Sequence, residues 1–187
     1  MAPLVWINGF PGSGKLTIAT AIAQLHEPAV VLDNHKLIDP VEARCPRTHP
    51  DYNKERRLYR QAVLDEFVCD ETTLSKLVIF TDFQSSNELG RDVAMEYRDA
   101  ARRSGRPFIP VYLTCDMDAN VQRIASLERV DSGTKKLTDA QQLQALRGRC
   151  ELFRFDECPS FTVDSTHLPP LEAAAKILAF LKDMDSL

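Results

Sequence analysis

The stretch WINGFPGSGKLTIA, residues 6–19, carries three of the chain's seven glycines and a lysine that directly follows them. Gly9, four intervening residues, Gly14 and Lys15 have the spacing of a phosphate-binding loop. An apolar run precedes the loop and a helical pattern follows it. In such a turn, backbone N–H groups point inward, and the helix start and the lysine add positive charge. The stretch therefore predicts an α/β fold with a phosphate site after the first strand. An incidental glycine-rich turn is the alternative.

The overall composition is that of a single folded domain. Hydrophobic residues make up 44% and charged residues 27% of the chain, a balance that opposes both disorder and a membrane protein. A chain of 187 residues is long enough for one sizeable core, so we expect one domain over residues 1–187. The formal net charge of −4 disfavours a protein that wraps nucleic acid, because such proteins carry a basic excess.

The cysteines and the N-terminal residues both indicate the cytosol. The five cysteines are an odd set without a Cys-x-x-Cys pair, which predicts free thiols in a reducing compartment. The apolar residues 3–10 are few and lack a basic flank, unlike a signal peptide. No apolar run has the length that spans a bilayer. We therefore expect a cytoplasmic protein that does not enter a membrane.

Strand and helix patterns alternate along the chain. Capping-box spacing predicts helix starts at Ser85 with Glu88 and at Thr138 with Gln141, and Gly105 is expected to end the first of these helices. The alternation predicts a mostly parallel, five-stranded sheet with helices on both faces. Its strands are expected at residues 4–8, 29–32, 77–81, 108–114 and 160–163.

Two segments do not fit this alternation. Residues 34–71 begin as a predicted loop, NHKLIDPVEARCPRTHPDY, and continue as an arginine-rich helix. Residues 129–137 are polar and contain Gly133. We expect both segments to close over a ligand at the edge of the sheet.

The loop GFPGSGKLT, residues 9–17, resembles that of the adenylate-kinase-like small P-loop kinases, whose pattern is Gly-x-x-Gly-x-Gly-Lys-x-Thr. Leu16 stands where other phosphate-binding loops place a serine or threonine, and Thr17 keeps the hydroxyl one residue later. The resemblance implies a three-layer α/β/α kinase fold, with residues 34–71 as an acceptor-binding excursion and residues 129–137 as a lid. It also implies ATP and Mg²⁺ as cofactors, with Mg²⁺ held largely through water. The nucleotide contacts that it implies are Gly9, Pro11, Gly12, Ser13, Gly14, Lys15, Leu16 and Thr17, with Ser165 and Thr166 beside adenine.

Acidic residues follow two of the expected strands, where ligands of a doubly wound sheet bind. By the same resemblance, Asp33 is the candidate general base that orients an acceptor hydroxyl and takes its proton. An ordinary turn aspartate is the alternative. Asp82 resembles an acidic residue that orients water on Mg²⁺, so Asp82 and Thr17 are the candidate metal residues. For Asp82, an acid at a helix start is the alternative.

Acceptor contacts are expected mainly from the excursion. Arg56 and Arg60 are four residues apart and share a helix face. Arginine forks match a substrate phosphate or carboxylate, although the same residues equally suit a helix face in water. His35 and Gln84 are further candidates, and for His35 a structural partnership with an aspartate is the favoured alternative.

Cations are expected where phosphoryl transfer spreads negative charge over the moving group. The resemblance places them at the end of the helix after the fourth strand, where this chain has Arg123 and Arg129. Arg129 is expected on phosphate and Arg123 near phosphate or adenine, both as catalytic residues beside Lys15 and Asp33. A solvated, charged helix face is the alternative.

These features predict an ATP-dependent phosphotransferase that acts on a hydroxyl or phosphate of a small molecule, with nucleosides and nucleotides among the candidates. A P-loop regulatory protein with slow hydrolysis and a kinase acting on RNA or DNA ends are the alternatives. An acceptor pocket would favour the first of these, and no guanine-reading Asn-Lys-x-Asp stretch is present. The acidic net charge opposes the nucleic-acid kinase, although residues 44–60 form a local basic patch. The expected partners are ATP and a small-molecule acceptor, bound by a monomer or a homodimer.

Overall fold

The computed structural model describes residues 1–126 and 137–185 and contains one five-stranded, entirely parallel sheet. All five predicted strands are confirmed, each to within one residue at either end. Their order across the sheet places the first strand in the centre. From one edge to the other the strands are β2 (Ala29–Asp33), β3 (Leu77–Asp82), β1 (Leu4–Gly9), β4 (Phe108–Thr114) and β5 (Phe161–Asp164).

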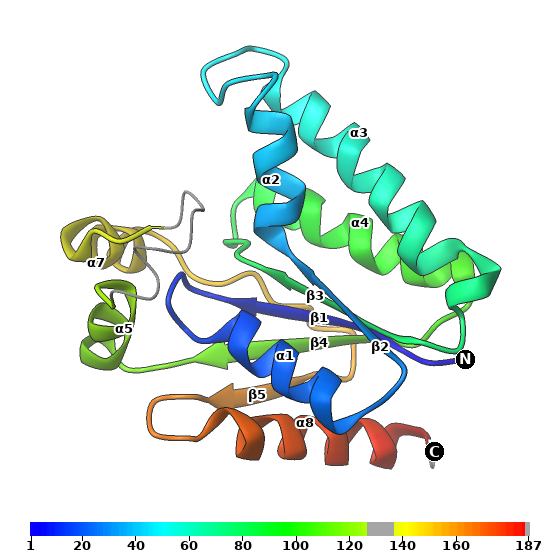
Figure 1. Cartoon of the computed structure of the whole chain (residues 1–187). Coiled ribbons are helices and arrows are strands. Elements are labelled where there is room, and N and C mark those ends of the chain that lie inside the picture. Colours follow the sequence, from blue (N-terminus) through cyan, green and yellow to red (C-terminus); the bar gives the residue numbers. More distant parts are fainter. Residues whose placement is uncertain (127–136, 186–187) are drawn as a thin grey trace.

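Helices cover both faces of the sheet, as the alternation predicts (Figure 1). On one face, α1 (Lys15–Leu25) and α8 (Pro170–Asp185) pack against the inward side chains of the strands. On the other face, α4 (Glu88–Ser104) forms a second buried cluster with strand residues that include Trp6 and Phe80. Burial on both faces explains why the strands read as continuous apolar runs in the sequence.

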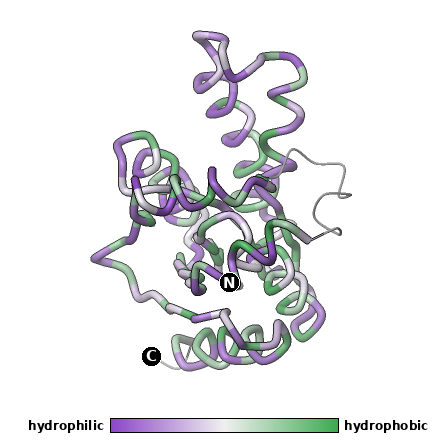
Figure 2. The backbone as a smooth tube through the Cα atoms, turned by 90° about the vertical axis from the view of Figure 1, so that its left-hand side faces the viewer, coloured by the Kyte–Doolittle hydropathy of each residue, from purple (hydrophilic) through white to green (hydrophobic). Residues whose placement is uncertain are grey.

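Figure 2 shows how unevenly hydropathy is distributed along the backbone. In α8, along the lower edge of that view, hydrophobic and hydrophilic residues alternate from turn to turn, which is the pattern of a helix with one buried face. Within the described ranges 1–126 and 137–185, no helix is both long and apolar enough to cross a bilayer.

The two predicted capping boxes are wrong by one or two residues. The cap of α4 is Asn87, whose side chain accepts a hydrogen bond from the Gly90 N–H (2.7 Å). Ser85 does not cap because it forms an antiparallel bridge with Leu152 and therefore stays extended. The cap of α7 (Ala140–Arg149) is Asp139, whose carboxylate is a stronger acceptor than the hydroxyl of the residue before it.

The end of α4 is as predicted. Gly105 follows the helix in the left-handed conformation, with φ of 73°, and its N–H bonds back to Arg102. Glycine adopts this conformation without the steric penalty of other residues.

The excursion after β2 is more helical than predicted. Residues 34–42, which we expected in a loop, form α2 (Asn34–Glu42), with Pro40 inside the helix. Two buried residues four apart, Leu37 and Val41, give this segment its apolar stripe. After a turn, the chain continues as α3 (Tyr52–Leu64), a π-helical turn η1 (Asp65–Cys69) and a short 3₁₀ turn η2 (Glu71–Thr73). Figure 1 shows α2 and α3 standing above the sheet.

A buried arginine links chain segments that precede three strands of the sheet, β1, β3 and β4. Arg106 is 4% exposed and donates hydrogen bonds to the carbonyl groups of Ala2, Val68, Thr73 and Lys76. Burial lowers the pKa of this guanidinium, which has neutral oxygens as partners. It therefore fastens the N-terminus, η1 and η2 to the turn before β4.

Replacing Arg106 with methionine is expected to lower the free energy of unfolding by about 3 kcal/mol, because several buried carbonyls lose their donor at once. Urea unfolding followed by circular dichroism would measure the change. Arg102→Met, at an exposed position of α4, is the matched control and should stay within about 0.5 kcal/mol of the wild type. Equal stabilities of the two variants would contradict this account of Arg106.

Candidate functional site

The carboxyl ends of the strands meet at one edge of the sheet and border a large cavity, as expected for a doubly wound fold. Its volume is about 1140 Å³. A pocket for one small ligand typically has roughly 300–1,000 Å³, so this cavity has room for more than one. It brings together predicted residues from distant parts of the chain, namely Lys15, Asp33, Arg56, Asp82, Gln84 and Arg123.

The glycine-rich loop, residues 9–17, forms one wall of the cavity. Gly12 and Gly14 are both left-handed, with φ of 82° and 86°. The Lys15 ammonium curls back over the loop and donates to the carbonyls of Gly9 (2.7 Å) and Phe10 (2.8 Å). The N-terminus of α1 has no side-chain cap and no acidic residue in its first turn. This arrangement places positive charge and N–H donors where a phosphate would lie.

Two buried side chains hold the outer side of this loop. Asn120, in α5 (Met117–Ile124), donates to the Pro11 carbonyl (2.6 Å). The Ser165 hydroxyl oxygen lies 2.9 Å from the Ser13 carbonyl oxygen and 3.0 Å from that of Thr114, and its single hydrogen is shared between these two acceptors. In a trans peptide the C=O and the next N–H point in opposite directions. Holding the Ser13 carbonyl outward therefore turns the following N–H toward the cavity.

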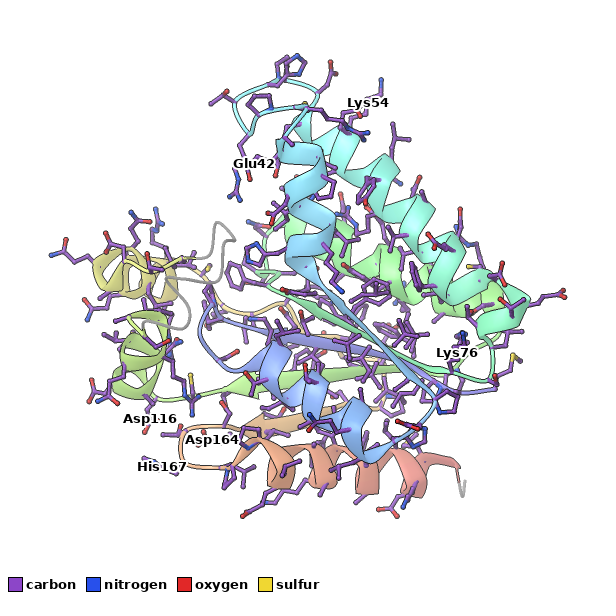
Figure 3. The ribbon with its side chains drawn as sticks, in the orientation of Figure 1. Glu42, Lys54, Lys76, Asp116, Asp164 and His167 are labelled. Atoms are coloured by element: carbon purple, nitrogen blue, oxygen red, sulfur yellow. The ribbon has the colours of Figure 1, made fainter. Side chains whose placement is uncertain are left out.

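The loop after β5 is built on short side-chain contacts. The Thr166 hydroxyl donates to Asp164 Oδ1 (2.6 Å) and accepts from the Asp116 N–H (2.9 Å), so it is fully engaged. Figure 3 shows Asp116 and Asp164 close together at the ends of β4 and β5. Ser165 lines the cavity, whereas Thr166 does not. Of the two predicted adenine contacts, Ser165 is therefore placed where a ligand could reach it, and Thr166 is not.

Arg123 lies beside the cavity and is fixed to the same loop. Its Nη2 donates to the carbonyls of Ser165 (2.6 Å) and Thr166 (3.0 Å), and its Nη1 donates to the Ser165 hydroxyl (3.2 Å). These acceptors are neutral, so the guanidinium keeps its charge for a ligand. Arg129, the other predicted arginine, lies outside the described residues.

Asp33 ends β2 and lines the cavity. Its Oδ1 accepts a hydrogen bond from the Thr81 hydroxyl (3.1 Å) on the neighbouring strand. A single neutral donor fixes the side chain without neutralising it. The position therefore suits a carboxylate that accepts a proton from a bound hydroxyl.

Asp82 is far more enclosed, with 1% of its surface exposed. Its Oδ1 accepts from Asn34 Nδ2 (2.6 Å) and from the Phe83 N–H (2.7 Å), and its Oδ2 accepts from Gln84 Nε2 (2.8 Å). The Gln84 side chain, a predicted acceptor contact, is thus turned toward Asp82. Neutral donors on both oxygens favour an indirect role at a metal, through water, over direct ligation.

The two arginines predicted to bind the acceptor have different surroundings. Arg60 is 3% exposed and forms a bidentate pair with Glu96 of α4, with N–O distances of 2.9 and 2.8 Å. Burial, the largest single influence, would lower the pKa of Arg60, but Glu96, Tyr97 and Asp82 together outweigh it and the pKa is raised. Arg56 donates only weakly to Asn34 Oδ1 (3.4 Å), and its buried Nε has no hydrogen-bond partner. Of the two, Arg56 has the capacity left for a ligand.

Other charged residues of the excursion are paired with one another. His35 Nδ1 lies 3.6 Å from Asp39 Oδ1, which matches the structural partnership favoured for it, although His35 also lines the cavity. Further ion pairs join Arg44 to Glu55, Arg47 to Glu42 and, across to α4, Arg57 to Glu96. These carboxylates offset much of the basic patch over residues 44–60.

Sequence reasoning missed several residues that shape the site. Asn8 is completely buried in β1 and fixes the Gln84 backbone through its Oδ1 (2.8 Å) and Nδ2 (2.9 Å). A polar residue within an apolar strand was a visible signal for it. Glu96 and Asn120 gave no such signal, because polar residues on helices usually face water.

The comparisons with known proteins establish the fold. No model of a protein family matches the chain, and no curated protein does. Among solved structures, a gluconokinase from Sinorhizobium meliloti 1021 is 19% identical, with a TM-score of 0.64 over 99% of this chain and 94% of the other.

Two further structures with this fold were solved with ligands. Shikimate kinase from Acinetobacter baumannii, in complex with shikimate, has 17% identity and a TM-score of 0.61 over 98% and 95% of the chains. The Mycobacterium tuberculosis APS kinase, in complex with AMPPNP and APS, has 18% identity and a TM-score of 0.61 over 97% and 98%. The chain therefore has the fold of the small P-loop kinases, as the resemblance implied.

Proposed function

We propose that this protein is an ATP-dependent kinase that transfers the γ-phosphate of ATP to a hydroxyl or phosphate group of a small molecule. One observation carries the proposal: a single cavity contains the glycine-rich loop with Lys15 and also Asp33 with Arg56. The first pair suits a nucleotide phosphate, and the second suits an anionic acceptor with a reactive hydroxyl. The kinases of the same fold that were solved with AMPPNP and APS or with shikimate support this division.

The nucleotide half of the site is the glycine-rich loop and its surroundings. Backbone N–H groups of residues 12–17 and the Lys15 ammonium bind the phosphates, and Arg123 with Ser165 borders the base or the ribose. Contacts with Asn120 and Ser165 fix the conformation of the loop, so little reorganisation is required during the reaction.

Mg²⁺ is the metal that this fold implies, and the residues at the cavity fit it. The Thr17 hydroxyl and the Asp82 carboxylate supply oxygen donors, the type that Mg²⁺ prefers. Among residues 1–126 and 137–185 there is no cluster of three or more metal-binding side chains, as expected when the phosphates supply most ligands. Thr17 would hold the ion, and Asp82 would hold it through water. When bound, the ion neutralises charge that develops on the phosphates.

In the transfer step, the oxygen of the acceptor hydroxyl forms a bond to the γ-phosphorus. The Asp33 carboxylate accepts the proton that this hydroxyl loses. The bond between the γ-phosphorus and the β–γ bridging oxygen breaks, and ADP leaves with that oxygen. Lys15 stabilises the negative charge on the phosphates. If the acceptor is a phosphate, its oxygen is already deprotonated and Asp33 has only a positioning role.

The acceptor half combines the Arg56 guanidinium with apolar walls. The buried Nε of Arg56 lacks a partner, and a buried donor without a partner is costly. A carboxylate or phosphate on the acceptor would supply that partner. Ile38, Phe83 and Val93 line the same cavity and would contact the carbon skeleton. We therefore propose an acceptor with an anionic group.

Replacing Arg56 with methionine is expected to raise the KM for the acceptor by at least about tenfold and to leave the KM for ATP unchanged. Steady-state kinetics with each substrate varied in turn would measure both constants. Arg57→Met is the matched control, because Arg57 is the next residue on α3, does not line the cavity and is mostly exposed. The same change in both variants would mean that Arg56 acts only through the charge of the helix.

A panel of acceptors tests the proposed function. Hydroxylated compounds with and without a carboxylate or phosphate, nucleosides and nucleotides would be assayed for stimulated release of ADP. Stimulation by an anionic member of the panel is the expected result. A constant slow release of ADP across the panel would contradict the proposal and favour a regulatory nucleotide-binding protein.

A further inference from the structure

Asn120 contacts the glycine-rich loop from outside the cavity and is completely buried. Its Nδ2 donates to the Pro11 carbonyl (2.6 Å), and its Oδ1 accepts from Arg147 Nη1 (2.9 Å) on α7. These partners allow the amide only one orientation. An arginine can only donate and a carbonyl can only accept, so the amide oxygen must face Arg147 and the NH₂ must face Pro11.

The orientation of the Asn120 amide determines the direction in which the Gly12 N–H of the loop points. Pro11 C=O and Gly12 N–H belong to one planar peptide unit and point in opposite directions. Since Asn120 holds the carbonyl outward, the Gly12 N–H turns toward the cavity, where phosphate is proposed to bind. The contact also excludes a side chain at Gly12, because a Cβ there would lie 2.5 Å from Asn120 Nδ2. Gly12 has φ of 82°, so this turn already requires glycine.

Arg147 is fixed in turn by the loop itself. Its guanidinium carbon lies 5.3 Å from the centre of the Phe10 ring, within the range of a cation–π contact. The Arg147 guanidinium thus contacts both the Phe10 ring and the Asn120 amide oxygen. Removing it would leave the buried Asn120 Oδ1 without this donor and would remove the constraint on the amide.

We propose that Asn120, oriented by Arg147, is a positioning residue that holds the Gly12 N–H toward the nucleotide phosphate and thereby sets the affinity for nucleotide. That the ligand is a nucleotide rests on the proposed function, whereas the effect of Asn120 on the loop conformation does not. Arg147 is the donor that fixes the amide, and Asn120 is the group that holds the loop.

Two substitutions of Asn120 separate its contacts. Asn120→Asp keeps an acceptor for Arg147 and removes the donor to Pro11. Asn120→Leu removes both contacts without adding charge, so it shows whether any loss of affinity comes only from repulsion between carboxylate and phosphate. Arg147→Lys keeps a donor for the amide, and Arg147→Met does not. Arg149→Met is the control, since Arg149 is exposed on the same helix and donates to the Ala145 carbonyl of its own helix.

The experiment measures ADP binding by calorimetry without acceptor, amide hydrogen exchange of residues 10–15 without nucleotide, and the melting temperature. Both Asn120 variants and Arg147→Met are expected to bind ADP about tenfold more weakly. Exchange in the loop should accelerate, and Asn120→Asp should melt close to the wild type because its carboxylate still binds Arg147. Arg147→Lys should recover most of the affinity, and Arg149→Met should behave as the wild type.

Wild-type ADP affinity in both Asn120 variants would overturn the proposal. So would a loss of affinity that only follows a general loss of stability, without faster exchange in the loop. If the wild type itself binds no ADP, the proposed function fails, and the exchange measurement still decides whether Asn120 holds the loop.

Discussion

Replacing Lys15 with alanine is expected to lower ATP-dependent turnover by about 1,000-fold and to leave the fold intact. The ammonium lies over the glycine-rich loop, within 2.8 Å of two of its carbonyl oxygens. It is therefore already in place when negative charge develops on the transferred phosphate, and removing one such preorganised donor typically costs 10²–10³ in rate. Release of ADP in the presence of the acceptor would measure turnover, and circular dichroism would report on the fold.

Lys54→Ala is the matched control for this substitution. Lys54 lies near the outer end of the α2–α3 excursion and does not line the cavity (Figure 3). Its removal should change turnover by less than about twofold. Unchanged activity in Lys15→Ala would show that phosphate binds elsewhere and would overturn the assignment of the glycine-rich loop.

Replacing Asp33 with asparagine is expected to slow the chemical step by about 10²–10⁴ and to leave the affinity for ATP nearly unchanged. Asparagine has the same shape and still accepts the hydrogen bond from Thr81, so the end of β2 should keep its structure. What it loses is the ability to take a proton from the acceptor. Single-turnover kinetics, with ATP binding measured separately, would distinguish the two effects.

The control for this substitution is Asp118→Asn, an exposed aspartate in the first turn of α5. It should leave both the chemical step and ATP binding within about twofold of the wild type. If Asp33→Asn instead weakened the binding of ATP with Mg²⁺ and bound substrate still reacted at the normal rate, Asp33 would belong to the metal site. Its proposed role as general base would then be wrong.

The sheet was predictable because its strands are buried on both faces. Their apolar runs are bounded by polar residues, so each strand could be located to within one residue. Gly105 could be identified as a helix end because a left-handed residue there favours glycine. The position of the glycine-rich loop also followed from local sequence, since its glycines and lysine are close together in the chain.

Contacts between distant segments were not predictable in this way. Helix α2 was missed because Pro40 and two later prolines indicated a loop, whereas the burial of Leu37 and Val41 stabilises the helix. The start of α4 was misplaced because Ser85 is held by Leu152, far away in the sequence. Local propensity gives way in both cases to tertiary packing.

The same limit applies to the site. Asp33, Asp82 and Arg123 were identified from their places after strands and helices, and the structure brings them to one cavity. The pairing of Arg60 with Glu96 could not be foreseen, because Glu96 lies 36 residues away on another helix. For the same reason, the sequence did not show which of Arg56 and Arg60 would be paired. How far a charged side chain is available to a ligand therefore depends on the partners that folding gives it.

The destination of the γ-phosphate tests the central claim most directly. ATP labelled with ¹⁸O in its γ-phosphate would be incubated with the protein, Mg²⁺ and the anionic acceptors of the panel, and the products followed by ³¹P NMR and mass spectrometry. The account predicts that the label appears in a phosphorylated acceptor and that Asp33→Asn abolishes this product. Label found only in inorganic phosphate, at a rate that Asp33→Asn does not change, would contradict it.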